Sequence, residues 1–318
     1  ALEKFVEHGD PKAPLFYQLS HETAKIGQDN PDSYYQNAKI SGECEYRVFG
    51  TRGNIGYLGF GTYFGDYGKP GRSGCGGYLE GSELQVNPDG SFEIFISCKQ
   101  KPGNWLPMEP DTTMLIVRQN YLDRTREEPA KLQIERIDSQ ERPATLNPVS
   151  FAQNLASAGA YVAATADLFA QWAEGLAETA NSLKPLDPKV TGGAHGDPHM
   201  LFHMGYWQLE ADEALVIEGR PPECAYWNFQ LSNVWMESLD YRYHQIHTNK
   251  HTTHYEDDGS FRLVIAHKDP GLPNWMDTAG HSRGTMALRW AKSSGNPTPE
   301  SRVVKQAELN QLRQGGSQ

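Results

Sequence analysis

The stretch Asp89-Gly-Ser-Phe-Glu-Ile-Phe-Ile-Ser-Cys98 occurs a second time as Asp258-Gly-Ser-Phe-Arg-Leu-Val-Ile-Ala-His267. Each copy is followed by Asn-Trp, and the offset is 258 − 89 = 169 for the turn and 274 − 104 = 170 for the Asn-Trp pair. The same register aligns 45–50 with 214–219 and 56–60 with 225–229. Self-similarity held over such a length indicates a duplicated unit of domain size.

Both copies show the alternation of half-buried strands. Phe92, Ile94 and Ile96 alternate with other residues after the first turn, and the second copy repeats the pattern from Phe261 to Ile265. Period-two alternation next to turn residues predicts strands, and Asp-Gly favours the positive φ angles of a tight turn. The sequence therefore predicts a mainly β protein with a helical insertion, built from two tandem antiparallel β-sandwich, jelly-roll-like units related by internal duplication.

The remaining segments are assigned around these units. Asn147-Pro148 is a helix start, and apolar residues from Phe151 to Leu176 keep helical spacing. Gly159 and Gly175 leave one long helix or a helical hairpin open, and the apolar stripe is interpreted as a surface packed between the two β units. We expect five parts: an N-terminal helical and loop segment 1–37, a first β unit 38–145, a helical insertion 146–185, a second β unit 186–292 and a loosely attached, partly helical tail 293–318.

Composition excludes several classes of function. The net charge of −11 argues against nucleic acid and anionic membranes, which favour basic proteins. No apolar run is long enough for a membrane span, and the start at Ala1, without a signal-like core, is interpreted as a processed or trimmed end. Four cysteines without CxxC spacing favour a reducing, cytoplasmic location, with Cys98 expected as a buried free thiol. The expected partner is a small molecule or glycan, and a homo-oligomer is left open.

The glycine-rich stretch 65–77 is a separate feature of the first copy. It lacks the strand–GxxxxGK[ST]–helix arrangement of a phosphate loop. We interpret it as a surface loop, and the alternative is a lid or a wall that a ligand approaches closely.

Positions where the two copies differ suggest function. At the common register Leu58 is replaced by Trp227, Gly59 by Asn228 and Cys98 by His267. His267 shares a strand face with apolar residues, so we expect it to point toward the core or a pocket at the core's edge. It is interpreted either as a general acid or base or as a core histidine satisfied by a hydrogen bond.

Carboxylates and aromatic side chains of the second copy extend this candidate site. Paired carboxylates can perform acid–base work at a glycosidic or amide bond, whereas an Asp240–Arg242 salt bridge on a solvated face is the structural alternative. Trp and Tyr stack on sugars or line pockets for lipophilic ligands, and they also fill sandwich cores. The acid–base candidates are Glu223, Glu237, Asp240, His267, Asp269 and His281, and the ligand-binding candidates are Trp227, Asn228, Trp235, Asn274 and Trp275.

Two groups of histidines raise the question of a metal: His244, His247, His251 and His254, and His195 with Asp197 and His199. Zinc sites use His and carboxylate at short spacing. However, His244 and His247 would point to opposite faces of a strand, and the β-rich stretch 252–255 contradicts a helical metal motif. We therefore predict no metal and no cofactor.

Several longer stretches resemble a known family: Asp89-Gly-Ser-Phe with Asn104-Trp105-Leu-Pro, Glu213-Ala-Leu-Val-Ile-Glu218, Pro221-Pro-Glu-Cys-Ala-Tyr-Trp-Asn228, Trp235-Met-Glu-Ser-Leu-Asp-Tyr-Arg242 and Asp269-Pro-Gly-Leu-Pro-Asn-Trp275. In these residues the chain resembles the bacterial domain-of-unknown-function family twelve-fourteen, over nearly its whole length. The resemblance implies jelly-roll β domains, but it implies no settled activity and no catalytic residue. A more distant likeness to the tandem jelly rolls of glycan-releasing amidases concerns the fold alone.

Together these patterns give two hypotheses for function. The first is a metal-independent hydrolase that acts on a glycoconjugate or a bulky lipophilic small molecule, with carboxylate and His acid–base chemistry in the second β unit. The alternative is a non-catalytic ligand-binding or assembly protein that uses the faces of the β-sandwiches.

Overall fold

The computed structural model of the chain describes residues 1–67, 71–139, 145 and 147–309. The chain forms two compact units. The first comprises Ala1–Ala24, Asp32–Ala166 and Lys189–Pro198, and the second comprises Lys25–Pro31, Asp167–Pro188 and His199–Gln318. Each unit is built on two sheets that face one another.

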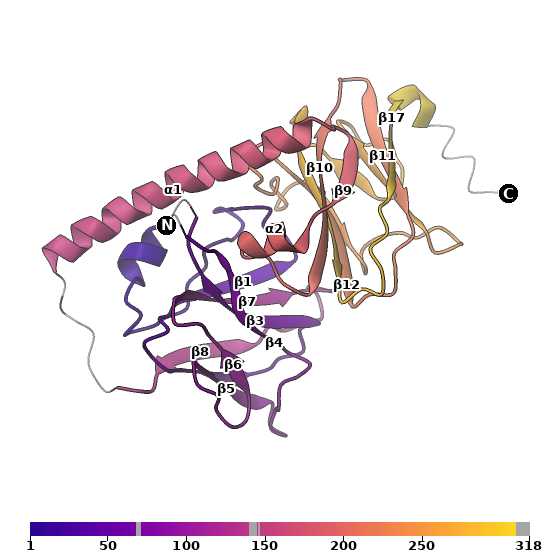
Figure 1. Ribbon diagram of the computed structural model, residues 1–318. Helices are drawn as coiled ribbons and strands as arrows, with labels where there is room; N and C mark the ends of the chain where they lie inside the picture. The colour runs from indigo at the N-terminus through magenta and orange to yellow at the C-terminus, as the bar shows by residue number, and fades with distance from the viewer. Residues whose placement is uncertain (68–70, 140–144, 146, 310–318) are drawn as a thin grey trace. The chain divides into compact units, whose positions relative to one another are not determined.

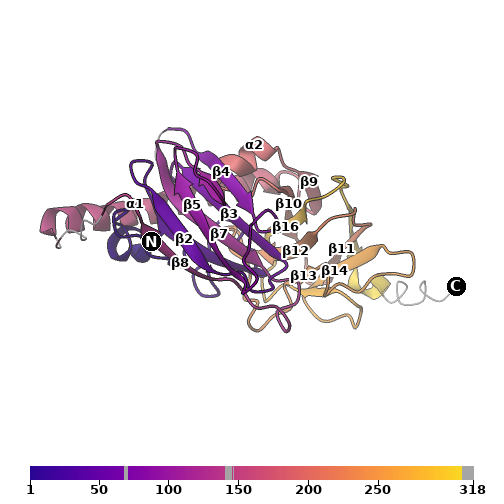
Figure 2. The same cartoon turned by 90° about the horizontal axis from the view of Figure 1, so that it is seen from below.

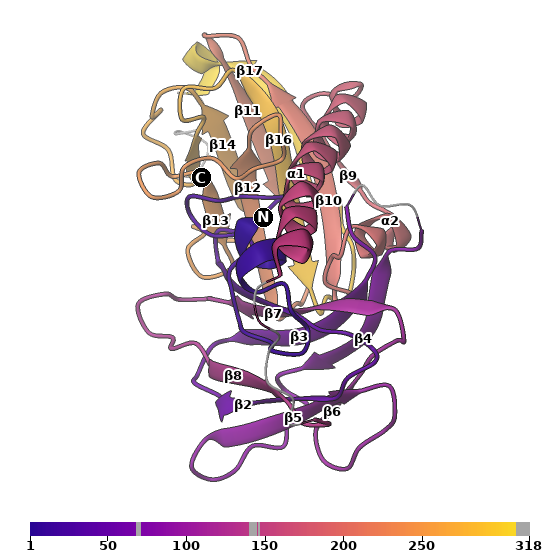
Figure 3. The same ribbon diagram turned by 90° about the vertical axis from the view of Figure 1, so that its left-hand side faces the viewer.

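The first unit is a sandwich of two four-stranded sheets (Figures 1 and 3). One sheet has the order β1 (Ser33–Lys39), β7 (Thr112–Asn120), β3 (Tyr57–Phe64), β4 (Gly74–Glu80), and the other has the order β6 (Trp105–Pro107), β5 (Ser91–Ser97), β2 (Tyr46–Thr51), β8 (Lys131–Arg136). Neighbours are antiparallel except β5 and β6, which pair in parallel. Phe92, Ile94 and Ile96 of β5 are buried in the core between the sheets, as the alternation predicts.

The second unit is a sandwich of the same kind (Figure 2). Its first sheet has the order β13 (His247–Asn249), β12 (Tyr226–Ser232), β16 (Arg283–Ala291), β10 (Met200–Gln208), β9 (Ser182–Pro185), and its second has the order β15 (Trp275–Asp277), β14 (Phe261–Ala266), β11 (Glu213–Gly219), β17 (Glu300–Lys305). Three fully buried tryptophans, Trp207, Trp227 and Trp290, fill its core. Such large rings remove much apolar surface from water, which is the main favourable term in folding.

The two units are similar halves. Strands β1, β7, β3 and β4 correspond in order to β10, β16, β12 and β13, and β6, β5, β2 and β8 correspond to β15, β14, β11 and β17. Gly90 and Gly259, in the repeated Asp-Gly-Ser turn, both have φ of 82°. The asparagines of the two Asn-Trp pairs each donate to two backbone carbonyls, so the repeated motifs build the scaffold in both units. The predicted mainly β fold with a helical insertion and two similar halves is confirmed.

A short arm lies on one sheet of each unit and is fixed by a buried arginine. In the second unit Arg289 donates to the carbonyl of Gln28, and in the first unit Arg118 donates to the carbonyl of His195. Gln28 and His195 have the same left-handed backbone, with φ of 57° and 58°. The arm Lys25–Pro31 precedes β1 of the first unit in sequence yet belongs to the second unit, and Lys189–Pro198 precedes β10 of the second unit yet belongs to the first.

The helical insertion is one helix, α1 (Pro148–Ala177), so the hairpin alternative is not adopted (Figure 1). Ala158, Tyr161 and Phe169 are buried, but Phe151 and Val162 are exposed, so only part of the apolar stripe is covered. The interpretation of the whole stripe as a packed surface was therefore too broad. A short helix α2 (Pro188–Gly193), the π-helical turn η1 (Glu3–Glu7) and the 3-10 turn η2 (Gln306–Glu308) complete the helices. Within the described ranges no helix combines the length and apolar character needed to cross a bilayer.

Several local expectations differ from the structure. β1 begins at Ser33, inside the segment expected to be helix and loop, and β4 (Gly74–Glu80) includes the last four residues, 74–77, of the glycine-rich stretch. Part of the expected loose tail is β17, because Glu300–Lys305 pairs along its length with β11. Cys98 is exposed just beyond β5, because the strand ends at Ser97. The expectations for residues 68–70 and 310–318 lie outside the described residues.

Candidate functional site

A pocket of about 350 Å³ lies within the first unit, where polar residues replace apolar ones along the inward faces of the strands. The inward face of β1 runs from Ala38 in the core through Gln36 to Tyr34. Gln36 faces Val117 of β7, and Tyr34 faces Gln119. Tyr121, after β7, and residues 129–132, at the start of β8, complete the lining. Because β1 and β8 are edge strands of the two sheets, the pocket opens along the side of the sandwich.

Gln119 fixes the orientation of the Gln36 side-chain amide, which lines the pocket. Its Oε1 accepts from the backbone nitrogen of Ala130 at 2.7 Å, and its Nε2 donates to the Ala130 carbonyl at 3.2 Å. The same Nε2 donates to Oε1 of Gln36 at 2.8 Å. Because Oε1 of Gln36 already accepts this hydrogen bond, the NH2 group of Gln36 is the end that can donate to a ligand.

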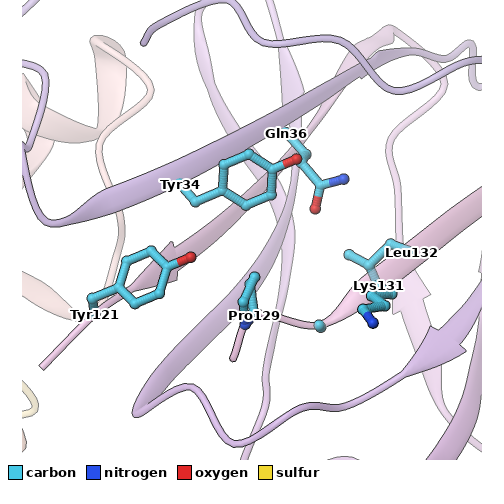
Figure 4. Close-up of a pocket in the computed structure, with 7 residues that line it drawn as sticks. Tyr34, Gln36, Tyr121, Pro129, Lys131 and Leu132 are labelled. Carbon is cyan, nitrogen blue, oxygen red and sulfur yellow. The ribbon is translucent and has the colours of Figure 1, made fainter. Parts of the chain in front are cut away.

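Three polar groups of the pocket have no hydrogen-bond partner among the residues that the structure describes: the hydroxyls of Tyr34 and Tyr121 and Nε2 of Gln36. Figure 4 shows the Tyr34 ring beside the Gln36 amide and the Tyr121 ring farther from that amide, with Pro129 between Tyr121 and Lys131. Burial, and secondarily the proximity of Tyr121, raises the pKa of Tyr34 above its ordinary value. Tyr34 therefore stays a neutral hydroxyl at physiological pH and can both donate and accept.

The corresponding place in the second unit is filled. His203 faces Leu288 of β16 as Gln36 faces Val117, so His203 takes the place of Gln36. Its Nε2 hydrogen-bonds the Thr298 hydroxyl at 3.0 Å. Trp290 takes the place of Gln119: its Nε1 donates to the Pro297 carbonyl at 3.3 Å, as Gln119 does to Ala130. A fully buried indole thus occupies in one unit the volume that a smaller amide leaves open in the other.

The carboxylate candidates of the second copy have separate surroundings. Glu223 and Asp269 are exposed, and Asp269 accepts from the backbone nitrogen of Gly271 in a local turn. Glu237 is partly buried and accepts from the Asn233 amide at 2.9 Å. Asp240 pairs with Arg242 at 2.8 Å, and these hydrogen bonds hold the pKa of Asp240 at about 2.

The two histidine candidates are also placed apart from a described pocket. His267 is half-buried after β14, where Nδ1 lies 2.9 Å from the Thr278 hydroxyl and Nε2 lies 3.4 Å from the Leu209 carbonyl. The Leu209 carbonyl can only accept, so Nε2 is the donor in that contact, whereas the Thr278 hydroxyl can donate to Nδ1 or accept from it. His281 is exposed in the turn before β16.

The predicted ligand-contact residues serve the scaffold in several cases. Trp227 is fully buried and packs on Phe261 with ring centroids 4.9 Å apart. Asn228 is buried between Asn30 and Arg289, which it contacts at 2.9 and 3.3 Å. Trp275 donates to the Ala266 carbonyl, and Asn274 holds backbone groups of residues 254 and 262. Trp235, in contrast, is 51% exposed and available for contact.

One group of charges gathers where the arm of the second unit meets the loop after β12. The carboxyl of Asp29 is buried and accepts from the backbone nitrogen and hydroxyl of Ser238 at 2.9 and 2.7 Å. Burial raises the pKa of Asp29. Lys25 Nζ donates to the carbonyls of Ser238 and Leu239, and burial lowers its pKa against the opposing effect of nearby Asp29, Asp240 and Glu237. Glu237 and Asp240 therefore lie near one another in this group, apart from the histidine candidates.

No cluster of three or more His, Cys, Asp or Glu side chains suited to a metal occurs in the described part of the chain. His195 is buried, with Nε2 3.1 Å from the Phe64 carbonyl and 3.0 Å from the Ser73 hydroxyl, and burial lowers its pKa to about 4. Asp197 accepts from the hydroxyls of Tyr57 and Tyr78 at 2.9 and 2.6 Å. His244 pairs with Asp277 at 2.7 Å. These residues hold the arm of the first unit and loops of the second.

The pocket residues Tyr34, Gln36, Tyr121 and Lys131 were not among the sequence candidates. The comparison of copies began at residue 45 and therefore missed the first strand of each unit. The register of 169 residues would place Gln36 on Gly205 and Gln119 on Leu288, so the correspondence of Gln36 with His203 and of Gln119 with Trp290 comes from the strand pairing in the structure.

The sequence and the fold both have relatives. The sequence matches the family described as "Protein of unknown function (DUF1214)" over residues 69–121 and 208–293. The crystal structure of an uncharacterized protein from Burkholderia cenocepacia is 47% identical, with a TM-score of 0.94 over 97% of this chain and 86% of that one. The VPA0106 protein from Vibrio parahaemolyticus shares the fold at 11% identity, with a TM-score of 0.55 over 96% of this chain and 94% of that one. Among curated proteins no match is found.

Proposed function

Because this chain belongs to the DUF1214 family of proteins of unknown function, we propose its function from the site itself: it binds a small molecule in the pocket of its first unit. One observation carries the proposal. Two hydroxyls and an amide NH2 without a partner in the described residues line a pocket of about 350 Å³. These groups face the pocket, so a ligand that enters it can form hydrogen bonds with them in place of water.

The difference between the units supports this assignment. We propose that the halves arose by internal duplication and that the second closed its copy of the site with Trp290 and the His203–Thr298 hydrogen bond. The first unit keeps Gln36 and Gln119 at the same places. A sandwich that needed only a packed core would gain stability by burying a large apolar ring there, as the second unit does.

The test uses the second unit as its template. The double variant Gln36→His and Gln119→Trp should close the pocket and abolish binding of every small molecule that the wild type binds, as measured by ligand-detected NMR with a library of aromatic acids, aromatic amides and methyl glycosides. Tyr34→Phe should weaken binding of the same molecules, whereas the matched variant Tyr243→Phe, at a tyrosine 78% exposed, should leave it unchanged. Binding that persists with the pocket filled would reject the proposal.

A second candidate function is the metal-independent hydrolase of a glycoconjugate or bulky lipophilic molecule. It is favoured by the Lys25 and Asp29 group, where Glu237 and Asp240 also lie. A carboxyl with a raised pKa next to an ionised carboxylate is the pairing that acid–base hydrolysis uses. Exposed Trp235 is on the same loop and would contact the ligand.

This candidate is tested separately with chromogenic glycosides and esters. Asp29→Asn, Glu237→Gln and Asp240→Asn should each abolish turnover, whereas His267→Ala, whose ring lies apart from this group, should retain it. Asp269→Asn, an exposed carboxylate in a turn, is the matched control. Absence of turnover in the wild type on such a panel, or equal rates in all variants, would count against hydrolysis while leaving ligand binding untouched.

A further inference from the structure

Resting on the proposed ligand site, we propose that the ligand is a small aromatic carboxylate. The charge of the pocket lining is the first reason. Among the seven lining residues Lys131 alone is charged, and no carboxylate is present, although the whole chain carries a net charge of −11. A locally positive site on an acidic protein favours an anion and disfavours a cation.

The rim beside Tyr121 carries charges of both signs. The guanidinium of Arg124 lies over the ring of Tyr121, 4.4 Å from its centroid. Acids of the adjoining loop are occupied by that loop: Glu127 accepts from the backbone nitrogen of Leu122 at 2.7 Å, and Asp123 accepts from Thr125 and pairs with Arg126. With Glu128 counted, residues 123–128 hold two arginines and three acids, a net charge of 2 − 3 = −1, so the positive charge at the pocket is that of Lys131.

The apolar part of the lining indicates the body of the ligand. Two tyrosine rings, Pro129 and the side chain of Leu132 provide flat or aliphatic surface. Planar rings pack on such surface with favourable aromatic contacts. A volume of about 350 Å³ is at the small end of ligand pockets, which suits one or two fused rings.

The polar groups distinguish a carboxylate from a phosphate. The Gln36 NH2 and the tyrosine hydroxyls can donate to a carboxylate's two oxygens, with one ammonium nearby. Phosphate sites generally provide several cations, an arginine fork or backbone nitrogens at a helix start. The helix starts of the described residues, at Glu3, Pro148, Pro188 and Gln306, contribute no residue to this lining.

The experiment compares matched probes by isothermal titration calorimetry: 1-naphthoate, its neutral amide 1-naphthamide, phenyl phosphate and methyl β-glucoside. We expect naphthoate to bind at least about tenfold more tightly than the amide and the phosphate. Lys131→Met should weaken naphthoate about three- to tenfold and leave the amide unchanged. Lys99→Met, which removes an equal charge from an exposed lysine outside the lining, should change neither.

The outcomes separate this inference from the proposed site. If naphthoate and naphthamide bind equally tightly, or if phenyl phosphate or the glucoside binds more tightly, the inference of a carboxylate ligand is overturned. The proposed site itself still stands in that case if Tyr34→Phe weakens binding of the probe. If Lys131→Met changes the affinity for naphthoate no more than Lys99→Met does, the charge of Lys131 plays no part in binding, and the inference is overturned. If no probe binds and the pocket-filling variant gives the same calorimetric trace as the wild type, both proposals fail.

Discussion

Removal of the Arg289 guanidinium is the sharpest test of how the second unit holds its arm. The side chain is 3% exposed and donates to the Gln28 carbonyl, to Oε1 of Gln230 at 2.7 Å and to Oδ1 of Asn228 at 3.3 Å. Arg289→Met keeps most of the volume but leaves these buried acceptors without their donor. Each unsatisfied buried group costs about 1–3 kcal/mol, so we expect a loss of about 3–5 kcal/mol in the free energy of unfolding.

Urea unfolding followed by tryptophan fluorescence measures this loss selectively. Six of the seven tryptophans belong to the second unit, and Trp105 alone belongs to the first. Arg118→Met, the equivalent change in the first unit, should cost a similar amount but should shift a circular dichroism transition more than the fluorescence transition. Arg289→Lys should recover little stability, because a single ammonium cannot replace the planar fork.

A local readout completes this test. Lys25 begins the arm, and Nζ of Lys25 is held by two backbone carbonyls. If Arg289 fixes the arm, then Arg289→Met should expose the bond after Lys25 to trypsin under native conditions, whereas Arg118→Met should not. Unfolding within about 1 kcal/mol of the wild type, together with unchanged cleavage after Lys25, would refute the role of this network.

Three further predictions concern single side chains. Burial lowers the pKa of His203 to about 4 from 6.5, so the unfolded chain binds more protons between these values and stability falls as pH drops through that window. By linkage the loss is about 2 kcal/mol at pH 5, and it should disappear from urea titrations of His203→Gln; an unchanged pH dependence would contradict this. Cys98 is exposed and Cys44 is buried, so Ellman's reagent should show a fast phase that Cys98→Ser removes; its survival would place the reactive thiol elsewhere. Asn274 combines φ of 54° with hydrogen bonds to three backbone groups. Asn274→Ala should cost about 2–4 kcal/mol in urea unfolding and Asn274→Gly clearly less, because only glycine accepts this backbone without strain; equal losses would exclude strain.

The candidate site was less accessible to sequence reasoning than the fold. The replacement of Cys98 by His267 marked a genuine difference between the copies, and the structure shows that the ring is held by Thr278 and Leu209. Trp227 was correctly identified as unusual, yet it lies in the core. A polar or aromatic replacement can serve packing as well as function, and a sequence does not show which partners surround it.

The sequence by itself determined the two β units, because the alternation of Phe92 to Ile96 and the Asp-Gly turn are local properties of consecutive residues. The same local pattern in both copies therefore predicts the same strands and turns in each. Only the tertiary structure decided the pocket, which draws on β1, the end of β7 and the start of β8, segments brought together by strand pairing and by the facing of two sheets. It also decided that each arm packs on the unit other than the one whose strand it precedes. That placement depends on long-range hydrogen bonds such as Arg289 to Gln28, 261 residues apart, which no periodicity along the chain can indicate.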